Sequence, residues 1–142
     1  MNGVAVKFDE NDVRPVGRNS VGVIGVELEN DSVIGMDIAD ENKTLLTVTE
    51  NGYGKRTLIS EYRLIRRGGK GVINIITSER NGKVVGIKNI SDSDDVMLIT
   101  KKGILARIPM KDVSSICRNT QGVKLIRIEE GDKLVNLAKT IE

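Results

Sequence analysis

Short apolar stretches rich in valine, isoleucine and threonine alternate with polar turns along the whole 142-residue chain. In the middle of the sequence they predict four strands, at Leu45–Thr49, Tyr53–Ile59, Val72–Thr77 and Lys83–Ile90. Asn51-Gly52, between the first two strands, is a strong hairpin signal because both residue types tolerate a positive φ. No segment places apolar residues at helical spacing, so we expect an all-β chain of about 11 strands with no helix longer than two turns.

This pattern occurs in three copies. A glycine followed four positions later by a basic residue occurs at Gly3–Lys7, Gly52–Arg56 and Gly103–Arg107. Fifteen residues after each basic residue comes a Gly-Val pair, and four positions before each of those glycines stands an arginine: Arg18, Arg67 and Arg118. The copies are offset by 49 and 51 residues. A repeat of this length with four strands is typical of the blade of a propeller or a related array.

The repeats divide the chain into a partial blade at 1–40, a complete blade at 41–92 and a last blade at 93–142, in one continuous domain. The first copy lacks a counterpart of Leu45–Thr49, so its blade lacks a strand. Fewer than three blades do not close a ring comfortably. We therefore expect a piece of a longer array with at least one unprotected strand edge, and self-association of such a fragment.

Composition excludes several kinds of chemistry. The chain has no histidine and a single cysteine, Cys117. Nucleophiles activated by histidine and an internal disulfide framework are thereby excluded, and a zinc site is implausible. No apolar run is long enough to cross a bilayer, and the first residues lack the pattern of a signal peptide. The sequence thus predicts no catalytic residue, no metal, no cofactor and no membrane partner.

Lysine and arginine are concentrated in two blocks, which the formal net charge of +2 conceals. Residues 52–83 hold eight basic and two acidic residues, and residues 101–127 hold seven and one. The rest of the chain holds seven basic and seventeen acidic residues. A surface that gathers cations and excludes carboxylates suits a phosphate backbone, whereas the alternative is a simple solvated face.

The loop Ile65–Gly71 places three cations among three glycines. Glycine lets backbone N–H groups approach an anion closely, while Arg66, Arg67 and Lys70 supply charge and hydrogen-bond donors. It is not a P-loop, because no GxxxxGK[ST] pattern precedes a helix here. The loop therefore predicts phosphate binding, with a flexible solvated loop as the alternative.

These motifs resemble the C-terminal domain of the A subunit of bacterial DNA gyrase. Ile65–Gly71 is similar to the family's Gln-Arg-Arg-Gly-Gly-Lys-Gly box, with isoleucine in place of glutamine. Further stretches that look like the family are Phe8–Gly22, Thr49–Thr57, Thr77–Gly86 and Cys117–Ile126. The resemblance implies a six-bladed β-pinwheel, a propeller-like disc. This chain corresponds to its last two blades and most of the one before, and the loop corresponds to a later-blade copy of the box.

The resemblance also implies a function. It is the binding and bending of duplex DNA, without sequence specificity, along a basic rim, in a non-catalytic part of the ATP-dependent enzyme that introduces negative supercoils. The implied partners are duplex DNA and the remainder of the gyrase A subunit, through which the chain is linked to the gyrase B subunit. The implied location is the cytoplasm, at the nucleoid. The residues expected to bind DNA are Lys7, Arg18, Lys55, Arg56, Arg66, Arg67, Gly68, Gly69, Lys70, Gly71, Arg107 and Arg118.

Other interpretations stay open. One is a C-terminal domain of the topoisomerase IV type. A second is a protein-binding propeller scaffold, which predicts an exposed apolar or aromatic patch from a chain with only three aromatic residues, Phe8, Tyr53 and Tyr62. A third, an enzyme with a propeller funnel, is disfavoured by the lack of histidine. Asp92, Asp94 and Asp95 lack the glycine and glutamate of an EF-hand loop, so a solvated turn is favoured over a calcium site.

Overall fold

A computed structural model describes residues 1–140, which form nine strands and three single-turn 3-10 helices. The elements in chain order are β1 (Val4–Ala5), η1 (Glu10–Asp12), β2 (Thr44–Thr49), β3 (Tyr53–Leu58), η2 (Ile59–Glu61), β4 (Val72–Ile73), β5 (Val84–Ile90), β6 (Asp95–Thr100), β7 (Leu105–Pro109), η3 (Met110–Asp112), β8 (Val123–Lys124) and β9 (Leu134–Lys139). The all-β prediction is confirmed. The described residues form fewer strands than expected because the first repeat has only one, β1.

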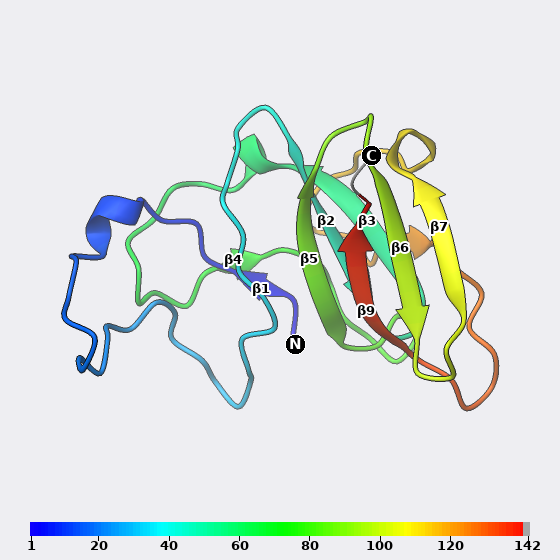
Figure 1. Cartoon of the computed structure of the whole chain (residues 1–142), viewed down its shortest axis with the longest axis horizontal. Coiled ribbons are helices and arrows are strands. Elements are labelled where there is room, and N and C mark those ends of the chain that lie inside the picture. The colour runs from blue at the N-terminus through cyan, green and yellow to red at the C-terminus, as the bar shows by residue number, and fades with distance from the viewer. Residues whose placement is uncertain (141–142) are drawn as a thin grey trace.

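The strands form three antiparallel sheets (Figure 1). One sheet has the order β5-β2-β3-β8, a second has the order β7-β6-β9, and β1 pairs with β4 in a small third sheet. Figure 1 shows the two larger sheets together on the right, with the long N-terminal segment reaching to the left.

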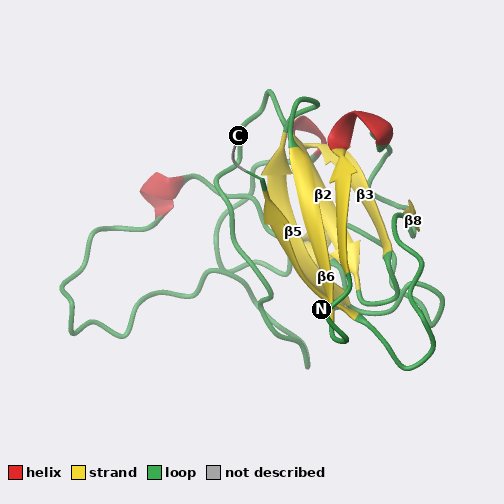
Figure 2. Cartoon of the chain, turned by 45° about the vertical axis from the view of Figure 1, so that its right-hand side comes forward, coloured by secondary structure: helices red, strands yellow, loops and turns green. Residues whose placement is uncertain are grey.

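The core lies between the two larger sheets. Leu46 and Val48 of β2, two positions apart and so on the same face of their strand, pack in one cluster with Leu98 of β6 and Leu137 of β9. Gly86 of β5 makes this contact possible, because a Cβ at Gly86 would lie 2.2 Å from the Leu137 side chain. Figure 2 shows the strands of both sheets stacked side by side.

Each later repeat contributes one strand to the sheet of the repeat before it. β4 belongs to the middle repeat but pairs with β1, and β8 belongs to the last repeat but pairs with β3. The prediction that Val72–Thr77 forms a fourth strand within its own blade is therefore wrong: only Val72–Ile73 is regular, and it pairs with the first repeat. The alternation of apolar and polar residues predicts a strand but not its partner, and the loop before β4 places this strand beside the preceding repeat.

Both contributed strands begin at a glycine that no other residue type could replace without strain. Gly71 has φ +83°, and a Cβ there would lie 2.5 Å from the carbonyl oxygen of Ala5. Gly122 has φ +78°, and a Cβ there would lie 2.6 Å from the carbonyl oxygen of Gly54. The repeated glycine therefore lets the incoming backbone take a left-handed turn directly against its partner strand.

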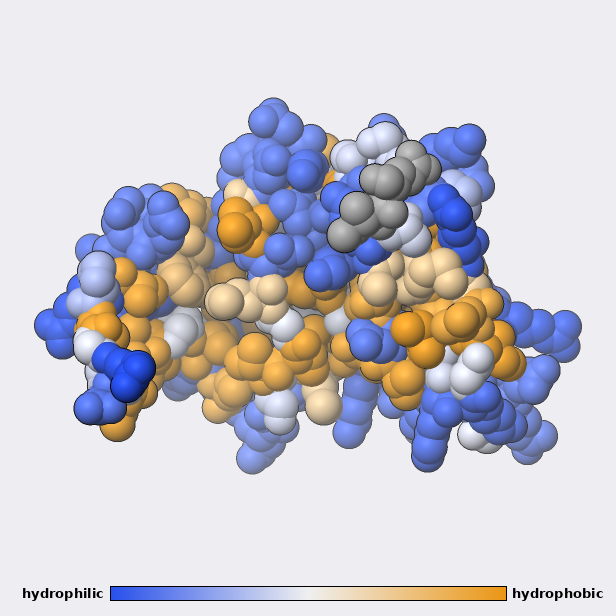
Figure 3. Space-filling view, in the orientation of Figure 1, coloured by the Kyte–Doolittle hydropathy of each residue, from blue (hydrophilic) through white to orange (hydrophobic). Residues whose placement is uncertain are grey.

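Between η1 and β2 the chain is an extended loop, the first part of which projects away from the larger sheets (Figure 2). Its later part returns to β5, where Asn89 hydrogen-bonds to Asp37 and Ile38. Its apolar side chains are unusually exposed, among them Val21, Met36 and Ile38. Figure 3 shows orange, apolar side chains at the surface of this part as well as over the sheets. Within residues 1–140 no helix has the length and apolar character to cross a membrane.

Candidate nucleic-acid interface

In the first two copies, the cation that follows the first glycine holds neighbouring repeats together. Arg56 of β3 is only 4% exposed. Its Nη1 donates to the carbonyl oxygens of Met110, at 2.5 Å, and Val113, at 3.1 Å, both in the last repeat. Its Nη2 pairs with Asp92, and its Nε donates to Thr44 Oγ1 at 3.1 Å. The expectation that Arg56 lies on an exposed rim is wrong.

Lys7 repeats this arrangement one blade earlier. Its ammonium pairs with Glu41 and donates to the carbonyl oxygen of Ile59 at 3.3 Å. Glu41 and Asp92 are 51 residues apart, as are Ile59 and Met110, so both bonds have counterparts around Arg56. The third member of the row, Arg107, is more exposed and donates from Nε to Asp95 Oδ2 at 2.6 Å. Lys7 and Arg56 therefore clasp neighbouring repeats together, whereas Arg107 pairs with Asp95 inside its own repeat.

The second row of arginines also reaches the preceding repeat. Arg67 donates from Nε to the carbonyl oxygen of Asp12 at 2.9 Å and from Nη1 to that of Ile24 at 3.0 Å. Arg118 donates from Nη1 to the carbonyl oxygen of Ile73 at 2.7 Å, and Ile73 is the repeat counterpart of Ile24. Both arginines are half-buried, whereas Arg18 of the first repeat is exposed.

Lys55 is the second buried cation that the sequence placed on the rim, and that expectation is also wrong. Its side chain is fully buried, and its ammonium donates to the carbonyl oxygens of Cys117, at 2.8 Å, and Arg118. Burial lowers the pKa of Lys55 to about 8, because removing the ammonium from water disfavours its charged form. Both faces of β3 are covered here, since Lys55 and its neighbour Arg56 are both buried, and a count of basic residues does not reveal this.

The glycine-rich loop 65–71 lies against the first repeat. The Ile65 amide donates to Lys7 O at 2.9 Å and the Gly68 amide to Gly25 O at 2.7 Å, while Gly69 O accepts from the Glu27 amide at 2.9 Å. These glycines therefore serve close contact between repeats. Arg66 and Lys70 remain exposed, and Lys70 Nζ lies 2.8 Å from Glu29 Oε1 in a solvent-exposed pair.

A cluster that sequence reasoning missed surrounds Tyr53. Arg80 Cζ lies 5.1 Å from the centre of the Tyr53 ring and Lys124 Nζ lies 5.7 Å from it. Arg80 Nε also approaches the Tyr53 hydroxyl at 3.4 Å, and this contact is the main cause that lowers the pKa of Tyr53. Both cations belong to the basic blocks of the sequence, but they are 44 positions apart, so the sequence did not indicate that they meet.

The turn that carries Arg80 is held on the last repeat's own loop, residues 116–122. Ser78 Oγ donates to Gln121 Oε1 at 2.8 Å, and Asn81 Nδ2 donates to Gln121 O at 3.0 Å. Loop 116–122 is the repeat counterpart of loop 65–71. Exposed cations thus flank equivalent loops on successive repeats, namely Arg66 and Lys70 at one and Arg80 and Lys124 at the next.

The acidic turn 92–95 is bonded to protein side chains. Asp92 pairs with Arg56, Asp94 lies 2.9 Å from Lys139 Nζ, and Asp95 pairs with Arg107. In the part of the chain that the structure describes, no three acidic or cysteine side chains gather to form a metal site. Tyr62 is 3% exposed, and burial raises its pKa to about 12.

Three features define an array of the β-propeller class. The chain has a four-stranded blade, its repeats exchange strands, and equivalent cations bond each of the first two repeats to the next. The family model described as "DNA gyrase C-terminal domain, beta-propeller" matches residues 1–40, 43–91 and 94–140. The chain belongs to this family of DNA gyrase C-terminal domains.

Relatives agree with this assignment. The A subunits of DNA gyrase from two bacteria are similar to this chain: that of Staphylococcus epidermidis is 43% identical over 140 residues, and that of Chlamydia pneumoniae is 44% identical over 139 residues. Each match covers 96% of this chain but only 16% and 17% of the two relatives, respectively. The chain therefore spans about one sixth of the length of these relatives.

Two solved structures are similar over nearly the whole chain. The structure of a DNA gyrase A C-terminal domain superposes with a TM-score of 0.89 at 30% identity, covering 99% of this chain and 48% of that one. The C-terminal domain of DNA topoisomerase IV gives 0.87 at 26% identity, covering 97% and 44%.

Proposed function

We propose that the chain binds duplex DNA without sequence preference and bends it, as the wrapping part of a gyrase A subunit that introduces negative supercoils. The chain itself performs no bond chemistry in this proposal. Its partners are duplex DNA and, in the nucleoid, the rest of the gyrase A subunit, which carries the B subunit. The observation that supports the proposal is the repetition of exposed cations beside equivalent loops of successive repeats in a member of the gyrase C-terminal family.

The contacts assigned to phosphates are those with exposed charge. Arg66 and Lys70 extend from loop 65–71, and Arg80 and Lys124 flank Tyr53 near loop 116–122. Because the two loops are one repeat apart, DNA that follows the curvature of the array meets a similar group of cations at each blade. Cations that contact phosphates position the duplex without reading base edges, so no sequence preference is expected.

The cations at the junctions between repeats have an indirect role. Lys7 and Arg56 fix one repeat against the next and so set the separation of the exposed groups. Bending 20–30 bp by 40–90° costs on the order of 1–6 kcal/mol, so a rigid spacing between several contacts is needed to offset it. Arg67 and Arg118 combine both roles, because each bonds a carbonyl oxygen while remaining half exposed.

The test is the salt dependence of binding to two unrelated duplexes of about 40 bp, followed by fluorescence anisotropy. Each phosphate contact contributes a slope of about −0.9 in log K against log salt, so about four contacts predict a loss of about a hundredfold for a fourfold rise in salt. Arg66→Ala with Lys70→Ala should flatten the slope by about two units, and Arg80→Ala with Lys124→Ala should do the same.

A matched control removes the same charge elsewhere. Lys43 and Lys133 lie in the acidic parts of the sequence and pair with Asp40 and Glu50. Lys43→Ala with Lys133→Ala should leave the slope unchanged within about half a unit. The proposal is wrong if this control and the Arg66/Lys70 pair change the slope equally, or if one duplex binds much more tightly than the other.

The topoisomerase IV neighbour supports a second candidate, a C-terminal domain of that enzyme type. The two candidates differ in wrapping. A wrapping domain changes the linking number of a plasmid that a type I topoisomerase relaxes in its presence, whereas a domain that only binds does not. We expect a shift in linking number that grows with the ratio of chain to plasmid.

A further inference from the structure

The strand pairing between repeats occurs twice in the chain with the same geometry. β1 pairs with β4, with Val4 opposite Ile73, and β3 pairs with β8, with Tyr53 opposite Lys124. In both cases the glycine before the accepting strand offers its carbonyl oxygen to the contributed segment. Gly3 O accepts from the Asn74 amide at 2.7 Å, and Gly52 O accepts from the Leu125 amide at 2.8 Å.

The last repeat presents the accepting half of this pairing. β7 is the counterpart of β3, but it is an edge strand, and within residues 1–140 only β6 pairs with it. Leu105 is 60% exposed. Gly103 has φ +87°, as Gly52 has φ +84°, yet no described atom lies within 4 Å of a Cβ built at Gly103, whereas at Gly52 the carbonyl oxygen of Ile126 is 2.4 Å away.

The first repeat presents the contributing half. We call residues Gly22–Val26 the donor segment, since they are the counterparts of the residues that begin with Gly71 and Gly122. Gly22 already has φ +84°, but a Cβ there would meet no described atom within 4 Å. The donor segment is held in place by Gly68, whose amide donates to Gly25 O, and by Arg67, which donates to Ile24 O.

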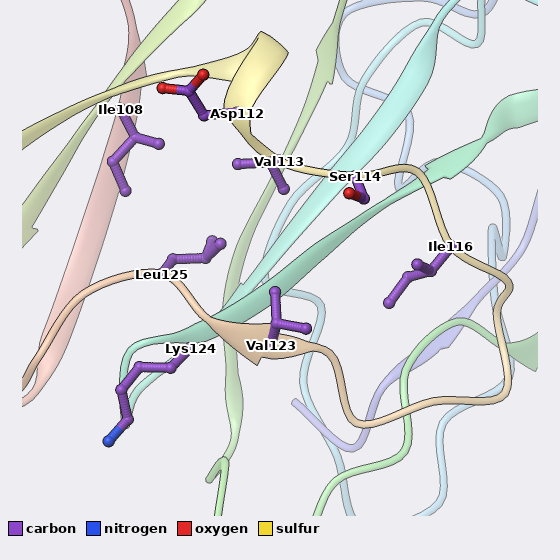
Figure 4. Close-up of a pocket in the computed structure, with 8 residues that line it drawn as sticks. All are labelled: Ile108, Asp112, Val113, Ser114, Ile116, Val123, Lys124 and Leu125. Carbon is purple, nitrogen blue, oxygen red and sulfur yellow. The ribbon is translucent and has the colours of Figure 1, made fainter.

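An apolar hollow lies beside the accepting strand. It measures about 320 Å³, and Figure 4 shows Val113, Val123 and Leu125 turned toward the same space. In the middle repeat the counterpart of Val113 is Tyr62, which is covered by Arg118 of the following repeat, with Cζ 5.9 Å from the ring centre. The counterpart of Arg118 in the first repeat is Arg18, which is exposed.

We propose that two copies of this chain associate head to tail, with the donor segment of one copy adding as an antiparallel strand to β7 of the other. The repeat offsets fix the register: Ile24 lies opposite Ile104, and Val23 lies opposite Leu105. The Gly25 amide of one copy donates to Gly103 O of its partner, and Arg18 lies over the hollow that Val113 lines. Such a heterologous contact forms a closed ring or an open chain, depending on the curvature of the array.

The first test measures self-association by sedimentation equilibrium across a range of concentrations. Gly25→Pro removes the amide that the interface uses, and Gly25→Ala is the matched control, because a Cβ at this position meets no described atom within 4 Å. Proline should weaken association about tenfold or more relative to alanine, since a buried carbonyl loses its partner. A wild-type chain that stays monomeric at millimolar concentration overturns the proposal.

The second test fixes the register and does not depend on proline being tolerated. In a Cys117→Ser background, Ile24→Cys chains are mixed with Ile104→Cys chains under mild oxidation. Directly opposed residues lie within the Cα separation of a disulfide, so mixed dimers should form. Replacing Ile104→Cys by Leu105→Cys puts the thiol on the other face of the strand and should abolish them. Equal cross-linking by both variants contradicts the register.

Discussion

Arg56 and Arg66 stand ten positions apart in the same basic block and have opposite surroundings. Arg56 satisfies carbonyl groups between two repeats, whereas Arg66 is exposed on loop 65–71. At the scale of single residues, a cation in this fold therefore contributes either to stability or to the proposed contact with DNA, according to which way its element turns it.

Replacing each arginine by methionine should separate the two roles. Arg56→Met leaves the carbonyl oxygens of Met110 and Val113 without a donor, so we expect the free energy of unfolding to fall by about 3 kcal/mol. Arg66→Met should change it by less than about 0.5 kcal/mol. Urea unfolding at neutral pH measures both values. Equal losses for the two variants would contradict the assignment.

Lys55 should give the stability of the chain a distinctive pH dependence. Its pKa is about 8 in the folded chain, against an ordinary value of 10.5. Between these values the unfolded chain binds a proton that the folded chain does not, so the free energy of unfolding rises with pH. The slope is at most about 1.4 kcal/mol per pH unit. Lys55→Met removes this contribution, so the difference between wild type and variant should grow as the pH rises above the folded pKa.

Tyr62 sets the upper limit for that measurement. Its pKa is raised from 10.0 to about 12 by burial, so the folded chain retains a proton that the unfolded chain loses above its ordinary pKa. Stability therefore falls in that range, opposite to the effect of Lys55. Unfolding curves between about pH 7.5 and 10, compared for the two chains, isolate the lysine. A difference that stays constant over this window would rule out a depressed pKa at Lys55.

The sequence shows where cations gather but not which of them are buried. The basic blocks correctly located Arg66 and Lys70 on an exposed loop. The burial of Arg56 and Lys55 could not be predicted, because charged residues are rarely buried unless they find partners, and their partners are backbone carbonyl groups of another repeat. The contact of Arg80 with Tyr53 brings together segments that no local pattern connects.

At the scale of elements, two equivalent glycines test how strands meet between repeats. Gly52 and Gly103 have nearly the same φ, but only Gly52 faces a carbonyl oxygen at 2.4 Å. Gly103→Ala should cost about 1–2 kcal/mol for the left-handed conformation alone. Gly52→Ala should cost clearly more, because its Cβ also displaces the contributed backbone. Thermal unfolding at low micromolar concentration, where copies are apart, provides the comparison.

Equal costs at the two glycines would mean that the contributed strand moves away freely. The same pair also marks what could be predicted of the elements. Glycine spacing and apolar alternation placed three strands of the middle repeat to within one residue at each end, but they extended the other well beyond its regular part, Val72–Ile73. They did not indicate that β4 and β8 join the preceding sheet, because alternation fixes the two faces of a strand but not its neighbour.

At the scale of the whole molecule, the two larger sheets pack against one apolar core, and β8 of the last repeat pairs with β3 of the middle repeat. We therefore expect the two sheets to unfold together. Leu46 and Leu98 are both buried in that core, in different sheets. Native-state hydrogen exchange should give their amides the same free energy of opening, equal to that of global unfolding. The amide of Val21, in the exposed N-terminal loop, should exchange with almost no protection.

The expectation of one cooperative unit is contradicted if the free energy of opening is several kilocalories per mole lower for the last repeat than for the middle repeat. Since β8 belongs to the last repeat, such independent opening would also remove the edge strand of the larger sheet. The measurement therefore reports directly on whether strand exchange couples the repeats.

Strand exchange has a consequence for how such arrays change during evolution. The middle repeat contributes a strand to the first repeat and receives one from the last through equivalent glycines, so a further whole repeat placed between them would find a matching partner at each junction. A gene duplication of about 50 codons would thus require no new interface. The number of blades is then free to vary between lineages, while the junction itself is the feature that selection must preserve.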